Sequence, residues 1–156
     1  MGKKRVGKKR VADDSRRGIK VAKDAADKIC QEDDNGIYVE GGKEWEIRSM
    51  QCSLGPSQVI QTKASNDHAS VRCQVSFFDC INLTELANQK YQGDLEALFA
   101  DTTHKHMMTE SDIKRALGYK TCYAWVITDV KVYRPPISHF SKAQRWVSVV
   151  DMTTSS

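Results

Sequence analysis

Several features are scarce in this sequence, and each scarcity excludes a class of protein. No apolar run approaches the roughly 20 residues that span a bilayer, so no membrane partner is expected. Proline occurs three times and glycine nine times, which excludes collagen-like and other fibrous classes. The five cysteines are odd in number and form no Cys-x-x-Cys pair, and the first residues are charged rather than apolar. These features favour an intracellular protein of the nucleus or cytoplasm.

The composition is that of a globular domain. With 156 residues, 40% hydrophobic and 28% charged, the chain is long enough for one domain with its own core. His104 and His106 lie close together in sequence, but no second pair of ligands follows at a spacing typical of zinc sites. We therefore expect no metal and no cofactor.

Positive charge is concentrated at the N-terminus. Residues 1–23 contain ten basic and two acidic residues, a net charge of +8, so the remainder carries −4 of the total of +4. The stretch GKKRVGKKRV repeats one five-residue unit that is too polar to bury. Residues 1–17 are therefore predicted to be a disordered basic arm that contacts nucleic acid or directs nuclear import. The folded domain is expected over 18–151, followed by a C-terminal tail at 152–156.

The first half of the domain favours a helix followed by strands. Apolar residues recur on one helical face over 22–29, and Asn35-Gly36 predicts a turn. Strands are predicted at 37–40, 43–50, 57–64 and 71–81. In the last of these, inward positions alternate with outward ones. The inward set is Val71, Cys73, Val75 and Phe77, and the outward set is Arg72, Gln74 and Ser76.

The second half has clear helix signals and one long strand. A helical pattern over 84–100 is broken near Gly93, and Thr109 with Asp112 predicts a capping box for a helix that ends before Gly118. The alternating stretch 122–133 is the strongest strand, terminated by two prolines, and 144–150 is a closing strand. An α+β fold follows, in which helices cover a small curved sheet or barrel.

The segment GGKEWEIR at 41–48 concentrates charge beside two glycines. On a strand, Glu46 and Arg48 share one face and can pair, while Trp45 points to the core. Such pairs are usually solvated and contribute less than about 1 kcal/mol. The glycines, however, permit a tight turn that brings the Lys43 ammonium toward the same face. The segment is either a solvated ion pair or the polar wall of a site.

Its pattern, Gly41-x-Lys43-x-x-Glu46-x-Arg48, resembles the G-x-K-x-x-E-x-R signature of the ASCH domain, which belongs to the PUA-like superfamily of small β-barrels associated with RNA. The order of the other elements over 18–151 is similar to that family. Two features depart from it: a wide separation between the first helix and the motif, and the basic arm. The resemblance implies a PUA-like β-barrel with covering helices.

It also implies a cleft beside the motif that accepts RNA or a nucleotide, as in a transcription or RNA-processing coregulator. Lys43 and Arg48 then supply positive charge, and Glu46 orients Arg48 or accepts from a base. Tyr123, with Trp125 and Tyr133, either stacks on unpaired bases or packs against a helix. The expected partner is single-stranded RNA or a modified nucleotide.

Two other functions stay open. Some bacterial relatives in this superfamily hydrolyse acetylated cytidine or cleave RNA, so catalysis by Lys43 with Glu46 is an alternative. In those relatives a threonine three residues after the lysine and a glutamate just before a helix complete the site. In this chain the threonine position holds Glu46, and the glutamate position falls near His106, with Glu110 as a displaced substitute. The acidic body also suits a protein-interaction module.

Overall fold

The structure, a computed structural model, describes residues 15–53, 58–62, 70–138 and 146–150. Strand β1 begins at Ser15, before the boundary predicted at residue 18, whereas the rest of the predicted arm and the tail at 152–156 lie outside the described residues. None of the helices in the described ranges has the length and apolar character needed to cross a membrane. The strands are β1 (Ser15–Val21), β2 (Trp45–Arg48), β3 (Gln58–Thr62), β4 (Ser70–Asn82), β5 (Tyr123–Ser138) and β6 (Trp146–Val150); the helices are α2 (Lys23–Cys30), α3 (Leu83–Lys90), α4 (Leu95–Asp101), α5 (Thr103–His106) and α6 (Glu110–Leu117).

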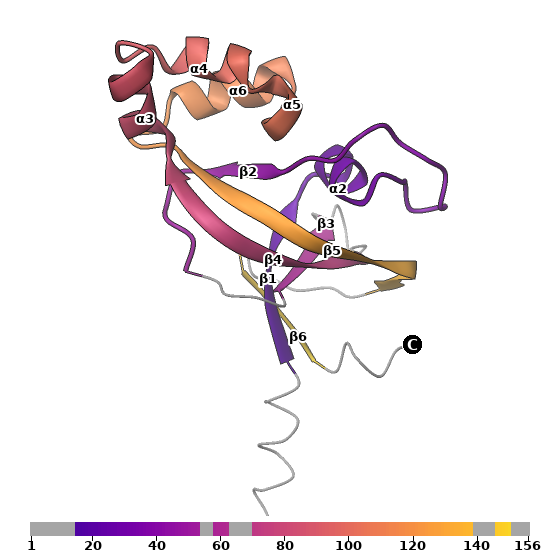
Figure 1. Ribbon diagram of the computed structural model, residues 1–156. Helices are drawn as coiled ribbons and strands as arrows, with labels where there is room; N and C mark the ends of the chain where they lie inside the picture. Colours follow the sequence, from indigo (N-terminus) through magenta and orange to yellow (C-terminus); the bar gives the residue numbers. More distant parts are fainter. Residues whose placement is uncertain (1–14, 54–57, 63–69, 139–145, 151–156) are drawn as a thin grey trace, which may run out of the picture.

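The strands form one mixed sheet in the order β2-β5-β4-β3-β1-β6. β1 pairs with β3 in parallel, and the other neighbouring strands are antiparallel. In Figure 1 the long strands β4 and β5 curve together through the molecule, α3 to α6 gather at one end, and α2 lies apart from them, beyond the start of β2. The predicted α+β class, with helices covering the sheet, is confirmed.

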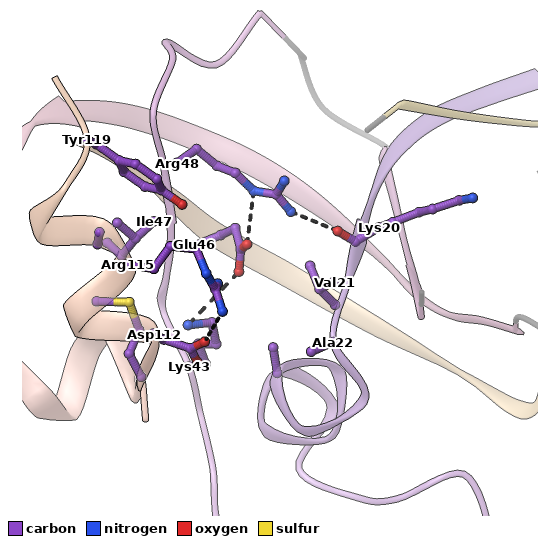
Figure 2. Close-up of a pocket in the computed structure, with 13 residues that line it drawn as sticks. Lys20, Val21, Ala22, Lys43, Glu46, Ile47, Arg48, Asp112, Arg115 and Tyr119 are labelled. Carbon is purple, nitrogen blue, oxygen red and sulfur yellow. Dashed lines mark hydrogen bonds and ion pairs between the residues drawn. The ribbon is translucent and has the colours of Figure 1, made fainter. Parts of the chain in front are cut away.

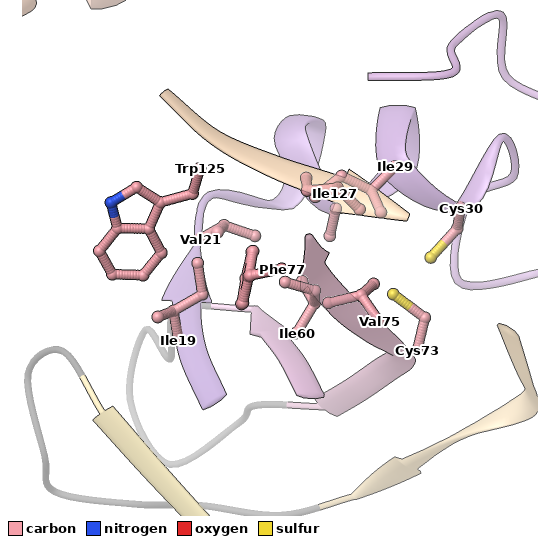
Figure 3. Packing of buried hydrophobic residues seen from close by; sticks show 11 residues of the cluster. Ile19, Val21, Ile29, Cys30, Ile60, Cys73, Val75, Phe77, Trp125 and Ile127 are labelled. Carbon is pink, nitrogen blue, oxygen red and sulfur yellow. The ribbon is translucent and has the colours of Figure 1, made fainter. Parts of the chain in front are cut away.

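Two main hydrophobic clusters hold the sheet and helices together. In the first, α2 packs on β1, β3, β4 and β5 (Figure 3). Within it the rings of Phe77 and Trp125 meet edge to face, with 5.4 Å between their centroids. In the second, α3, α4 and α6 cover β2 and the start of β5. Since β5 contributes to both clusters, it connects the helical end of the molecule to the first core.

The predicted apolar side of β4 is confirmed for Cys73, Val75 and Phe77, which are buried in the first cluster. Val71 is buried as well, but it packs with Val59 in a separate cluster, because the register of the ladder shifts between Val71 and Cys73. The prediction that Arg72 faces outward is wrong: only 1% of this residue is exposed. Its guanidinium donates to Asp27 Oδ1 at 2.7 Å and to the Glu32 carbonyl at 2.7 Å. An ion pair with additional hydrogen bonds can therefore stay buried beneath α2.

Two predicted boundaries are wrong for local reasons. Residues 37–40 contain one isolated bridge, between Tyr38 and Glu32, instead of a strand. The predicted turn at Asn35-Gly36 precedes them, and Asp33 Oδ1 accepts there from the amides of Asn35 and Ile37. Strand β5 does not end at the prolines but continues to Ser138. The register of β4 and β5 shifts between Val71 and Cys73, so the prolines fall at an irregularity of the ladder, where a missing N–H is tolerated.

The helix signals are confirmed. The pattern over 84–100 is divided into α3 and α4 at Gly93, whose φ of +82° interrupts the helix. The Thr109 side chain accepts from the Asp112 amide at 3.2 Å, and the Asp112 carboxylate accepts from the Thr109 amide at 3.4 Å. This reciprocal capping begins α6, which ends at Leu117 as predicted.

The ion pair between Asp27 and Arg72 predicts a large stability effect. Asp27→Ala leaves a buried guanidinium without its carboxylate, so we expect the free energy of unfolding to fall by about 3 kcal/mol. Urea denaturation measures this change, with Glu40→Ala, which removes an exposed carboxylate, as the control. The double variant Asp27→Ala/Arg72→Met removes both charges and should recover part of the loss. Equal stabilities of Asp27→Ala and Glu40→Ala would contradict this role.

Candidate functional site

The two glycines bind the charged segment to the end of α2. The Lys28 carbonyl accepts from the amides of Gly42, at 2.8 Å, and of Lys43, at 3.3 Å. A Cβ on Gly41 would lie 2.3 Å from that carbonyl oxygen, and Gly42 has a φ of +97°. Only residues without a side chain allow this approach and this turn. The docked backbone satisfies a helix-end carbonyl and directs the Lys43 side chain inward.

Lys43 is buried, with 5% of the residue exposed. Its ammonium donates to the His106 carbonyl and lies 4.0 Å from Glu46 Oε1. Burial lowers the pKa of Lys43 below its usual value, and the negative charge of Glu46 opposes that effect only in part. The site thus contains an amine that releases its proton more readily than a surface lysine.

Glu46 links Lys43 to Arg48. Arg48 Nε donates to Glu46 Oε2 at 3.0 Å, and Arg48 Nη2 donates to the Lys20 carbonyl at 2.9 Å. The guanidinium also lies 5.9 Å from the centre of the Trp125 ring. These contacts hold the Arg48 head in one orientation. Trp45, on the opposite face of β2, is in the second hydrophobic cluster, so its prediction as a core residue is confirmed.

The charged row forms one wall of a pocket of about 240 Å³. β2 and the residues before it provide this wall, the end of β1 and the start of α2 form the second, and the third comes from α6 and the residues flanking it (Figure 2). The third wall contains Met108, Asp112, Arg115, Ala116 and Tyr119. Sequence reasoning placed Lys43, Glu46 and Arg48 together but missed this wall. Its only signal was the capping box, which marks a helix start without indicating what the helix faces.

His106 and Glu110, the candidates for the glutamate of the enzyme relatives, do not line the pocket beside Lys43. The His106 ring is buried; its Nδ1 accepts from the Met108 amide at 2.9 Å, so its Nε2 donates to the Phe99 carbonyl at 2.8 Å. Burial lowers the pKa of His106, which favours this neutral form. Glu110 is exposed and does not line the pocket. The acidic residue that α6 presents there is Asp112.

The predicted aromatic platform is not at the pocket. Trp125 is completely buried in the first hydrophobic cluster with α2, and its indole N–H donates to the Met50 carbonyl at 2.9 Å, so of its two predicted roles the packing role is the one that the structure has. Tyr123 is half-buried against the first hydrophobic cluster and does not line the pocket. A stacking role for Tyr123 stays a prediction. The aromatic side chain that does line this pocket is Tyr119.

The mixed sheet, its grouped helices and the pocket beside β2 define an α+β architecture. Three crystal structures of the ASCH protein of Zymomonas mobilis, two of them of mutant proteins, share this fold. One mutant is 15% identical with a TM-score of 0.55, covering 88% of this chain and 89% of its own. The structure of the ASCH protein itself is 16% identical with a TM-score of 0.53, and the alignment covers 85% of each chain.

The other mutant is 16% identical with a TM-score of 0.54, and the alignment covers 85% of this chain and 88% of that protein. The resemblance to ASCH domains is thus confirmed at the level of the fold. No protein-family model matches the sequence, and no curated protein matches it.

Burial of Lys43 predicts a pH-dependent stability. In the unfolded chain its pKa returns to about 10.5, whereas in the folded chain it is lower. Between these values the unfolded chain binds a proton that the folded chain has lost, so the free energy of unfolding rises with pH. We expect the stability of the wild type relative to Lys43→Met to increase as the pH approaches 10.5, measured by urea denaturation.

Lys114→Met, which removes an exposed lysine of α6, is the control and should keep the wild-type trend. A wild-type stability that stays constant or falls relative to Lys43→Met over this range would contradict the lowered pKa.

Proposed function

We propose that the protein binds single-stranded RNA, or one nucleotide of it, in the pocket beside Lys43, Glu46 and Arg48. The observation that carries this proposal is a pocket with a pre-oriented guanidinium in its wall. Its volume of about 240 Å³ lies just below the roughly 300–1,000 Å³ of typical small-molecule sites. The pocket therefore suits one nucleotide unit instead of a duplex.

The local charge supports an anionic ligand. The charged side chains that β2 and α6 bring to the pocket, with the lysine before β2, are three cations (Lys43, Arg48 and Arg115) and two carboxylates (Glu46 and Asp112). The chain after residue 23 has a net charge of −4, so positive charge is locally concentrated here. Glu46 orients Arg48 for directional hydrogen bonding to a phosphate or a base edge. The ASCH-type fold is consistent with this role.

A binding experiment tests the proposal directly. Full-length protein is titrated into fluorescently labelled single-stranded RNA at two salt concentrations, and anisotropy is measured. Arg48→Gln removes a charged donor and should weaken binding about tenfold. Lys43→Met should weaken it as well, and wild-type binding should fall steeply with salt. Lys114→Gln, which removes an exposed charge outside the pocket, is the matched control.

A variant lacking residues 2–12 separates the pocket from the basic arm. Circular dichroism and thermal melting establish that each variant is folded. Wild-type binding by Lys43→Met and Arg48→Gln, together with loss of binding in the arm deletion, would assign RNA binding to the arm and contradict the pocket proposal. Absence of RNA binding would favour a protein-interaction module.

A hydrolase is the second candidate, because Lys43 is a buried amine with a lowered pKa beside a carboxylate. Asp112, which lines the same pocket, provides an acidic group where sequence reasoning had placed Glu110. In this role the wild type releases cytidine from N4-acetylcytidine or shortens labelled RNA, and Lys43→Met does neither. Chromatography of the products measures both reactions. If neither product forms, the hydrolase candidate is wrong.

A further inference from the structure

Four basic residues line the pocket: Lys20, Lys43, Arg48 and Arg115. Lys20 presents its backbone carbonyl to Arg48, and Figure 2 shows its side chain pointing away from the charged row. The other three differ in how strongly neighbouring groups hold their charged ends. Lys43 is buried against the His106 carbonyl and Glu46, and the Arg48 side chain is 19% exposed and bonded to Glu46 and to a backbone carbonyl. The Arg115 side chain is 62% exposed. Its ion pair in the structure is with Asp112, at 3.4 Å between Nη2 and Oδ1.

This ion pair constrains Arg115 only weakly. The two residues are one turn apart on α6, and exposed pairs of this kind add little stability because water solvates both partners. Figure 2 shows the Arg115 side chain reaching from α6 into the pocket, across from the β2 wall. The guanidinium can therefore exchange Asp112 for a ligand oxygen at small cost. Its planar fork of donors fits two oxygens of one phosphate.

We propose that Arg115 binds the phosphate of a nucleotide whose base or sugar occupies the inner part of the pocket, between Lys43 and Arg48. The site then takes a phosphorylated nucleotide in preference to the free nucleoside. This inference rests on the proposed function and names the class of ligand and the residue that selects it. Arg115 comes from the helical wall and is not part of the charged segment on β2.

Asp112 opposes this selection. Its carboxylate faces the pocket, pairs with Arg115 and repels a phosphate placed beside it. A bound phosphate must therefore replace Asp112 as the partner of Arg115. Removing the charge of Asp112 should strengthen phosphate binding, the opposite of the effect of removing Arg115. The variant Asp112→Asn keeps a side-chain oxygen that can accept a hydrogen bond from the Thr109 amide, so it preserves the cap of α6.

Isothermal titration calorimetry of the full-length protein tests the proposal. The probes are the four ribonucleosides and their 3′- and 5′-monophosphates. The wild type should bind at least one monophosphate more tightly than its nucleoside. Arg115→Gln should lower the affinity for that monophosphate about tenfold and leave the affinity for the nucleoside unchanged. Asp112→Asn should raise the affinity for the monophosphate. Lys114→Gln, on the same helix but outside the pocket, should change the affinity for neither ligand.

The outcomes separate this inference from the proposed function. If Lys43→Met lowers binding of RNA and of the monophosphate but Arg115→Gln lowers neither, RNA binding stands and the role of Arg115 is wrong. If Arg115→Gln lowered the affinities for the nucleoside and the monophosphate equally, the proposal would also be overturned, because Arg115 would then affect the shape of the pocket and not the recognition of phosphate. If the wild type binds neither RNA nor any of these probes, both proposals fail.

Discussion

The candidate site depends on the contact between the two glycines and the Lys28 carbonyl. Gly41 lies so close to this carbonyl that a side chain would overlap it, and Gly42 makes the turn that follows. This contact determines where the chain enters β2 and on which side the Lys43 ammonium lies. The row of Lys43, Glu46 and Arg48 follows from that entry, and so does the wall that faces α6.

Stability and function make different demands on the two buried ion pairs. Arg72 and Asp27 connect β4 to α2, and the second guanidinium donor of Arg72 is used by a backbone carbonyl. Asp27 also accepts from Lys23 Nζ at 3.0 Å, and the pair belongs to the core beneath α2. Lys43 is also buried, but its Glu46 partner is shared with Arg48 at the wall of an open pocket. Incomplete compensation of a buried charge is typical of sites that bind a ligand or move a proton.

Sequence reasoning succeeded where a short-range signal has one structural solution. The capping box at Thr109 and Asp112 and the break at Gly93 are such signals, and the structure has both. It failed where a long-range contact reverses the local preference. Arg72 alternates as an outward residue but is buried because Asp27, on a distant helix, neutralises it. For Trp125 the sequence left stacking and packing open, and the structure has packing, with the indole N–H donating to the Met50 carbonyl in the interior.

By itself, the sequence determined the α+β class, most helix and strand positions, and the composition of the charged segment beside its glycines. These depend on periodicity, capping and backbone freedom, which act over a few residues. Only the tertiary structure decided that α6 faces β2, bringing Asp112 and Arg115 to Lys43 and Arg48. That meeting depends on how helices and strands far apart in the chain bury their apolar faces together, and side-chain packing of this kind leaves no local pattern in the sequence.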